Sequence, residues 1–224
     1  GYRNKMEFSF TSSPQTGGLE KSPIQLAFFT RGGRQKIAVD GSALADPRIN
    51  QAAQYLLAWI RTQAIPLRSL KTLIVRSNGE KTIAALFIKD ELDLAAPMLK
   101  APLSGLSLFY STHKSPASVP TACLWSSGES TLTHRIGDTI LEHGVFSFFQ
   151  VNVPVFAFAL QDIRRALDPN LPLLDYYAGV GAIGVCATRE PQTVTLVEEN
   201  AEAVYFAKKN IAANDRLHCE IVHA

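Results

Sequence analysis

Apolar and polar residues alternate with a period of two in the first part of the chain, which predicts β-strands. The alternation is clearest at residues 6–10, M-E-F-S-F. Between residues 47 and 60 the apolar spacing changes to three and four, with Asp46 before Pro47, which predicts a capped helix. Strands resume on both sides of an Asn-Gly pair, a typical hairpin turn. The expected strands are residues 24–29, 36–39, 71–76, 81–88 and 106–110, followed by a loop at 112–120 and short strands up to 148.

Strands and helices alternate one by one after residue 149, which is the pattern of a parallel, doubly wound sheet. Only about three parallel strands fit, although central parallel strands are normally covered on both faces. We therefore expect an α+β, strand-rich central domain at 1–140 and an incomplete Rossmann-like α/β domain at 141–224. The expected strands of this second part are 171–176, 193–197 and 219–222, and the expected helices are 153–167, 182–188 and 201–213.

Composition places the chain among globular proteins, with 46% hydrophobic and 19% charged residues. No apolar run approaches the roughly 18 residues of a membrane helix, and no leader pattern is visible. Cys123, Cys186 and Cys219 are far apart and form no metal-ligand pattern. We therefore expect a cytoplasmic protein with reduced thiols, no metal site and no membrane partner.

Charge is unevenly distributed along the chain. Residues 1–140 carry 16 Lys/Arg and 10 Asp/Glu, a difference of +6, whereas residues 141–224 carry 6 and 10, a difference of −4. The two differences sum to the net charge of +2. A basic first part suggests an anionic partner such as nucleic acid.

A glycine motif, G-x-G-x-x-G, lies at residues 179–184 between an expected strand and an expected helix. Glycines and a helix N-terminus suit either a dinucleotide or S-adenosylmethionine. Asp175, at the end of the strand, would repel a pyrophosphate and attract the ammonium and sulfonium groups of S-adenosylmethionine. Glu198 ends the next strand, where an acidic residue binds ribose hydroxyls of either ligand. Asp175 therefore favours the methyl donor.

Three segments together resemble the RNA uracil-5-methyltransferase family, which methylates C5 of uridine in tRNA or ribosomal RNA. They are G-Y-R-N-K-M-E-F at 1–8, F-F-Q-V-N at 148–152 and D-Y-Y-A-G-V-G at 175–181, the last followed by Val197-Glu198 and by A-x-x-x-A-K-x-N at 203–210. The resemblance runs from one end of the chain to the other. It implies S-adenosylmethionine as the cofactor and RNA as the partner.

The resemblance also implies roles for matching residues. Gln150, near the transferring methyl group, Tyr177 and Glu198 would contact S-adenosylmethionine. The expected cofactor-binding set is Gln150, Asp175, Tyr177, Gly179, Gly181 and Glu198.

Tyr2, Arg3 and Lys5 would lie on the RNA side. Arg and Lys suit phosphates and Tyr stacks on an unpaired base, although a frayed strand with solvated charges is an equal alternative. Arg31 and Arg34, in a turn, are further candidates.

Two positions depart from the family pattern. Some members ligate an iron–sulfur cluster with a cysteine where this chain has Ser42-Ala43-Leu44, so we expect no iron–sulfur cluster. Ala182 stands where members often carry Asn or Thr, so a contact there would come from the backbone.

The groups that perform the family's chemistry are missing. In the family, a Cys thiolate adds to uridine C6, C5 attacks the methyl group, and a carboxylate removes the C5 proton. The family's Asp-Pro-Pro-Arg segment, Cys and Glu follow the third parallel strand, and Asp-Pro-Pro-Arg does not occur in this sequence. The cysteines present read as core or strand residues, and His134 and His143 as structural or surface groups. We therefore expect no catalytic residue here and an inactive chain.

Two other functions remain open from the sequence. One is a non-catalytic RNA-binding or scaffold protein that keeps the methyltransferase fold. The other is a dinucleotide-dependent oxidoreductase. The sequence leaves open which RNA and which uridine are recognised, and the oligomeric state.

Overall fold

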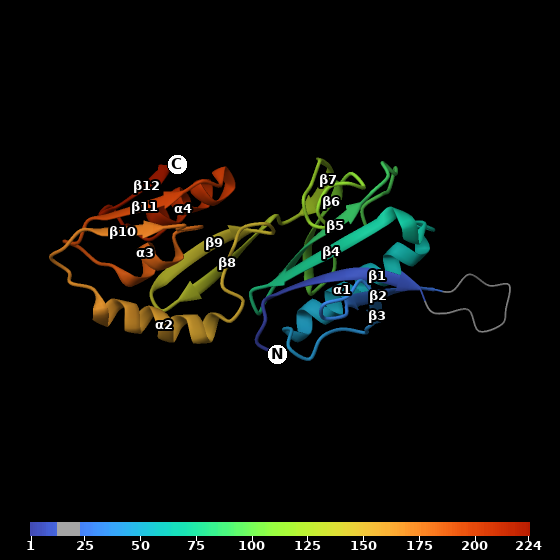
Figure 1. Ribbon diagram of the computed structural model, residues 1–224, viewed down its shortest axis with the longest axis horizontal. Coiled ribbons are helices and arrows are strands. Elements are labelled where there is room, and N and C mark those ends of the chain that lie inside the picture. Colours follow the sequence, from blue (N-terminus) through green and yellow to red (C-terminus); the bar gives the residue numbers. More distant parts are fainter. Residues whose placement is uncertain (13–22) are drawn as a thin grey trace. The chain divides into compact units, whose positions relative to one another are not determined.

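The chain folds into two compact units (Figure 1). The computed structural model describes residues 1–12 and 23–224. Unit 1 is Gly1–Ser130 and unit 2 is Thr131–Ala224, so the hairpin that follows Ser130 groups with unit 2. The functional boundary that we expect between residues 140 and 141 stays a prediction. No helix among the described residues combines the length and apolarity needed to cross a membrane.

Unit 1 is built on a seven-stranded sheet with the order β3-β2-β1-β4-β5-β6-β7. The hairpin β4–β5 turns at Gly79, whose φ is +90°, as the Asn-Gly pair predicts. The parallel pairing of β5 with β6 is not foreseen by the sequence pattern. The strands are β1 Lys5–Ser12, β2 Ile24–Phe29, β3 Lys36–Ala38, β4 Leu70–Ser77, β5 Thr82–Ile88, β6 Leu103–Tyr110 and β7 Ala122–Gly128, and a short 3-10 helix covers Leu67–Ser69.

One long helix, α1 (Pro47–Thr62), packs its apolar face into the hydrophobic core of unit 1. Asp46 caps it as expected, since its carboxylate accepts a hydrogen bond from the Arg48 backbone N–H at 2.8 Å. The buried face of α1 packs against strand residues such as Phe8, Leu73 and Leu86. The helix residues on that face are Ile49, Ala52, Ala53, Leu56, Leu57 and Ile60, the set that the spacing predicts.

Unit 2 combines a β-hairpin with a three-stranded parallel sheet of order β10-β11-β12. The alternation of strands and helices predicted from the sequence is confirmed. The elements are β8 Thr131–Ile136, β9 Thr139–Gly144, α2 Val153–Ala166, β10 Leu173–Tyr176, α3 Ala182–Ala187, β11 Val194–Glu198, α4 Ala201–Ala213 and β12 Cys219–His223.

The two faces of the parallel sheet differ in burial. Val194 and Leu196 are at most 1% exposed, on the face where α3 and α4 contact the sheet. On the opposite face Leu174, Tyr176 and Val222 are 50%, 63% and 42% exposed. Within the described residues, one face of this parallel sheet is therefore open, which is unusual for such a sheet.

Two asparagines, one within α4 and one that caps its C-terminus, join the hairpin to the helix. Asn210, 1% exposed, donates to the carbonyls of Glu142 and Val180 at 3.0 and 2.9 Å and accepts from the Glu142 N–H at 2.7 Å. One turn later, Asn214 donates to the Ile140 carbonyl and accepts from the Ile140 N–H. The side chains thus satisfy backbone groups of β9 as a neighbouring strand would.

We predict that Asn210→Ala lowers the free energy of unfolding by about 2–4 kcal/mol, because it leaves several buried backbone groups without a partner. Urea unfolding followed by circular dichroism measures the loss. Asn170→Ala is the matched control, since its amide is exposed and bonds only to the nearby Asp168, and we expect a change within about 0.5 kcal/mol. Equal stability of the two variants would contradict the prediction.

Candidate ligand-binding site

The loop between β10 and α3 has the backbone shape that its glycines allow. Gly179 and Gly181 have φ of +57° and +82°, and Tyr177 also has a positive φ of +58°. A Cβ on Gly181 would lie 3.0 Å from a Val185 methyl and 3.1 Å from a Leu196 methyl. At Gly179 the nearest atom is the Phe148 carbonyl oxygen, 3.9 Å from a Cβ. Gly181 is therefore required by packing, whereas Gly179 borders open space where a ligand can approach the backbone.

Asp175 lies beneath the first turn of α3. Its Oδ2 accepts a hydrogen bond from the Gly184 N–H at 3.0 Å, and the residue is 8% exposed. Burial raises the pKa of the Asp175 carboxyl, although the bond from Gly184 opposes the shift. The carboxylate therefore positions α3 against the strand end, and its role as counter-charge to a cationic ligand stays a prediction.

Glu198 holds the opposite side of the same loop. Its Oε2 accepts from the Gly179 N–H at 2.8 Å and its Oε1 from the Asn200 N–H at 2.8 Å. The Ala178 N–H donates to the Val197 carbonyl at 3.1 Å, so the loop is tied to β11 at two successive residues. The structure thus brings together four residues predicted from the sequence, namely Asp175, Gly179, Gly181 and Glu198.

Two exposed aromatic residues, Tyr177 and Phe148, belong to the glycine loop and to the segment whose backbone approaches it. Tyr177 is 89% exposed and Phe148 is 73% exposed. Phe149 is buried, with its ring 4.5 and 4.8 Å from the rings of His143 and His134, which shows a packing role for both histidines. This packing holds the segment whose Phe148 carbonyl faces Gly179, two residues before the half-buried Gln150.

The candidate RNA-side residues belong to unit 1. The Arg3 backbone bonds to Leu44 and Asp46, and Lys5 starts β1, so this segment is an ordered strand rather than a frayed one. Burial lowers the pKa of Lys5, with repulsion from Arg76 as the next cause. Tyr2 is 49% exposed. Contact of Tyr2, Arg3 and Lys5 with RNA stays a prediction.

Neither of the two buried cysteines has the environment of an activated nucleophile. Cys186 is buried, and burial raises the pKa of its thiol to about 11. Burial also raises the pKa of Cys219. Cys123 is exposed on β7 near the Ser126 hydroxyl. Over residues 1–12 and 23–224, no group of three or more His, Cys, Asp or Glu side chains is arranged to hold a metal ion.

Comparison with known proteins finds a family model that matches unit 2 and similar proteins that match nearly the whole chain. Residues 138–224 match the family described as "Methyltransferase small domain". A protein of Nitratidesulfovibrio vulgaris named "Uncharacterized RNA methyltransferase" is 24% identical over 99% of this chain and 50% of its own length. A protein of Clostridium acetobutylicum with the same description is 23% identical over 99% of this chain and 52% of its own length. This chain is therefore similar to proteins named RNA methyltransferases along nearly its whole length. It spans about half the length of the curated relatives it matches.

The fold matches a solved structure over the whole chain. The tRNA (uracil-54, C5)-methyltransferase of Pyrococcus abyssi, solved with S-adenosyl-L-homocysteine, superposes with a TM-score of 0.79 at 18% identity. The match covers 100% of this chain and 55% of that one. The mixed α/β fold expected from the sequence, with a methyltransferase-like second part, is therefore confirmed.

We predict different outcomes for two substitutions of Asp175. Asp175→Ala removes the acceptor of the Gly184 N–H and costs about 1–3 kcal/mol of unfolding free energy, whereas Asp175→Asn keeps an acceptor oxygen. Because the folded-state pKa is raised, the favourable contribution of Asp175 is complete below its unfolded pKa and is lost as pH rises through the folded value.

The stability of Asp175→Asn relative to the unsubstituted protein should therefore increase as pH rises above about 4. Urea unfolding at several pH values measures this difference. A difference that decreases with rising pH would show that the carboxylate is stabilised by its surroundings rather than strained by burial.

Proposed function

We propose that this chain is the RNA-facing and donor-binding part of an enzyme that transfers a methyl group from S-adenosylmethionine to C5 of uridine in tRNA or ribosomal RNA. The observation that carries the proposal is the glycine loop held between two acidic strand ends, Asp175 and Glu198. Two carboxylates beside one loop favour a cationic ligand. The bound donor would supply an electrophilic methyl group on a sulfonium sulfur.

The residues around the loop suit this ligand. Glu198 lies at the end of β11, where a carboxylate can accept hydrogen bonds from ribose hydroxyls. The exposed Tyr177 ring and the open space at Gly179 offer an aromatic face and an approachable backbone. Gln150 follows the Phe148 carbonyl that faces the loop, which supports the role of its amide in orienting the donor.

The dinucleotide alternative is disfavoured by the same contacts. A pyrophosphate needs the loop N–H groups as donors. The N–H groups of Gly179 and Gly184 already donate to carboxylates, and a phosphate that replaced them would lie against two negative charges.

We also propose that the described chain does not complete the reaction alone. No Asp-Pro-Pro-Arg segment occurs in the sequence, and the two buried thiols have raised pKa values. The open face of β10–β12 supports a further layer contributed by additional polypeptide. The specificity for uridine C5 rests on the resemblance and on the P. abyssi structure's name.

Calorimetry with two ligands tests the donor site. S-adenosylmethionine carries a sulfonium charge that S-adenosylhomocysteine lacks, while both carry the ribose. We expect Glu198→Gln to weaken both ligands alike, by about tenfold, because it weakens bonds to the shared ribose. Asp175→Asn should weaken both ligands, because both carry an ammonium group, and should weaken S-adenosylmethionine by about tenfold more, since only this ligand also carries the sulfonium charge.

Asn170→Ala is the control, because Asn170 is exposed and its amide bonds only to Asp168. Tight binding of NAD with no binding of either methionine derivative would overturn the proposal. An equal loss for the two ligands would show that Asp175 does not pair with the sulfonium, and unchanged affinity for both would remove Asp175 as the counter-charge.

Methyl transfer by the chain itself is a separate measurement. We expect no transfer of tritium from methyl-labelled S-adenosylmethionine to unmodified tRNA or ribosomal RNA by these 224 residues, because the sequence has no Asp-Pro-Pro-Arg segment and its two buried thiols have raised pKa values. Turnover that survives simultaneous replacement of Cys123, Cys186 and Cys219 by Ser would rule out cysteine-dependent C5 chemistry. Turnover lost on replacing one cysteine would identify a nucleophile and show the chain to be active.

A further inference from the structure

Three lysines, Lys36, Lys71 and Lys89, meet at one end of the unit 1 sheet. Lys71 is the second residue of β4, and Lys89 directly follows β5, with its N–H donating to the Ser69 carbonyl at 2.7 Å. They therefore flank the same end of the β4–β5 ladder. Lys36 lies on β3, and its ammonium donates a hydrogen bond to the Phe10 carbonyl on β1 at 2.9 Å. Strand β1 pairs with β4 on the side opposite to β5.

No carboxylate among the described residues, 1–12 and 23–224, forms an ion pair with these lysines. Asp90, the adjacent carboxylate in sequence, is engaged by the Ser69 hydroxyl at 2.5 Å and by His113 at 3.6 Å. Burial, and then repulsion by Lys89, lower the pKa of both Lys36 and Lys71.

The three lysines differ in how far they are committed to the fold. The Lys71 ammonium donates to the Ser111 hydroxyl and to the carbonyls of Thr112 and Ser115 at 2.7–2.9 Å, so it anchors the loop after β6. Lys36 is exposed, and Lys89 is half-buried with no side-chain hydrogen bond to any part of the chain that the structure describes. The Lys36 ammonium makes one hydrogen bond, to the Phe10 carbonyl, so Lys36 and Lys89 are the two that keep donors for an anion.

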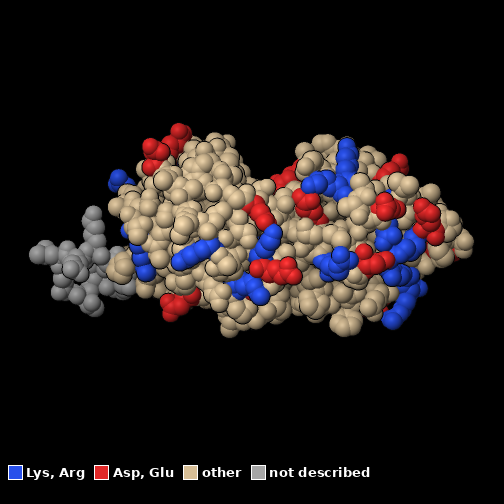
Figure 2. Space-filling view, turned by 180° about the vertical axis from the view of Figure 1, so that it is seen from behind, with Lys and Arg blue, Asp and Glu red and all other residues tan. Residues whose placement is uncertain are grey.

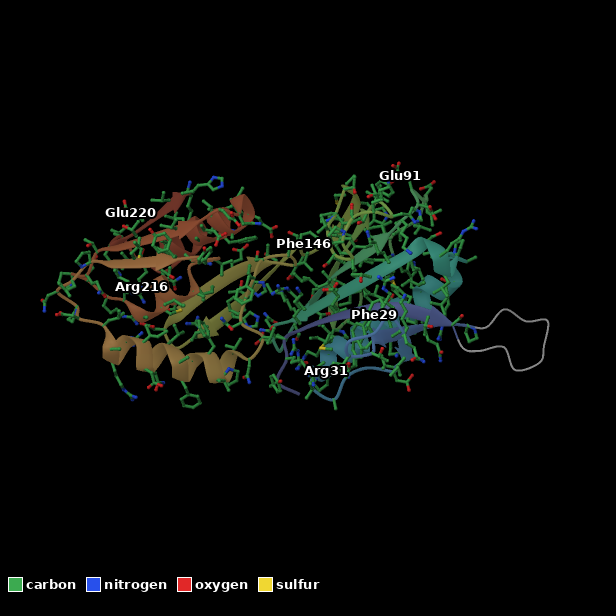
Figure 3. The ribbon with its side chains drawn as sticks, viewed as in Figure 1. Phe29, Arg31, Glu91, Phe146, Arg216 and Glu220 are labelled. Carbon is green, nitrogen blue, oxygen red and sulfur yellow. The ribbon has the colours of Figure 1, made fainter. Side chains whose placement is uncertain are left out.

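An exposed aromatic ring lies beside this charge. Phe29 ends β2 and is 56% exposed, with the Lys36 ammonium 5.2 Å from its ring centroid. The neighbouring Phe28 is different, because it packs on the core with its ring stacked 5.2 Å from Phe8. Arg31, exposed in the turn that follows Phe29, adds another cation; both are labelled in Figure 3.

Net charge alone does not identify such a surface. Figure 2 shows Lys and Arg side chains dispersed among Asp and Glu over the visible face of the chain. The distinguishing feature is the combination of an open aromatic face with ammonium groups that form no ion pair among the described residues. An ammonium binds a phosphate, and an aromatic face stacks on a base that is not in a duplex.

We propose that Phe29, Lys36 and Lys89 form a docking surface for a single-stranded segment of RNA, on which Phe29 stacks with one base and the two lysines bind adjacent phosphates. The identity of the partner as RNA rests on the proposed function. A single aromatic ring bordered by ammonium groups offers stacking without the broad apolar area that membrane insertion requires. This surface would bind phosphates and stack on any base, so we expect no selection of a nucleotide sequence.

Fluorescence anisotropy with a fluorescein-labelled oligouridylate of about twelve nucleotides tests the surface on the full chain. We expect Phe29→Ala to weaken binding by about tenfold, and Phe29→Tyr, which keeps a stacking ring, to restore it. The double variant Lys36→Gln/Lys89→Gln should lower the slope of log affinity against log salt by roughly 1.4, the value for two phosphates of a single strand. Lys100→Gln is the control, because Lys100 is an exposed lysine of the same unit that lies over Tyr55 of α1.

Affinity unchanged by Phe29→Ala, or a salt slope reduced as much by Lys100→Gln as by the double variant, would overturn the proposal. Binding of phosphatidylserine vesicles without binding of the oligonucleotide would overturn it as well. Calorimetry with S-adenosylhomocysteine on the same variants separates this surface from the donor site. RNA binding that depends on Phe29, by a chain that binds no donor, would support this inference and refute the proposed function. Donor binding, together with RNA binding that Phe29→Ala leaves unchanged, would support the proposed function and refute this inference.

Discussion

The arrangement of unit 2 depends on two carboxylates that bind backbone N–H groups of one loop. Asp175 accepts from Gly184 and Glu198 from Gly179, so the glycine loop is fixed at both ends by the strands that flank it. Hydrogen bonds to ionised acceptors are stronger than neutral ones. These bonds within the chain hold the left-handed backbone at Gly179 and Gly181. A preformed loop of this kind reduces the ordering cost of binding.

A second set of polar contacts connects this loop to helix α4 and to the hairpin. Asn210 connects the Val180 carbonyl, inside the glycine loop, to the Glu142 backbone of the hairpin. Near the start of the same helix, the Ser147 hydroxyl donates to the Glu202 carboxylate and accepts from the N–H of Gly144, the last residue of β9. Helix α4 is thus the common support of the hairpin and of the glycine loop.

Local sequence patterns predicted the elements well, and for identifiable reasons. The α1 spacing, the Asp46 cap and the Asn-Gly hairpin are determined by neighbouring residues, so the chain fixes them locally. The strand–loop–helix context of the glycine motif placed Asp175 and Glu198 beside one loop, because the ends of adjacent parallel strands meet at one edge of a sheet.

Contacts between distant residues were not predictable in this way. The parallel pairing of β5 with β6 and the bonds from Asn210 to Glu142 join residues far apart in the chain. The sequence predicts Asp175 as a ligand for a cation, whereas in the fold its carboxylate accepts a hydrogen bond from the Gly184 N–H of α3. Only the fold reveals this contact. Phe29 gave no signal either, because the pattern does not tell which of two adjacent phenylalanines faces the core.

The uncovered side of β10–β12 has a consequence for how this polypeptide behaves in isolation. Leu174, Tyr176 and Val222 form an apolar surface, and the outer strands β10 and β12 have no strand beyond them among the described residues. Open strand edges next to apolar side chains recruit other strands. Handled alone and concentrated, the chain is therefore inclined to self-associate through this sheet, and a companion segment that masked it would act as a solubilising partner as much as a structural one.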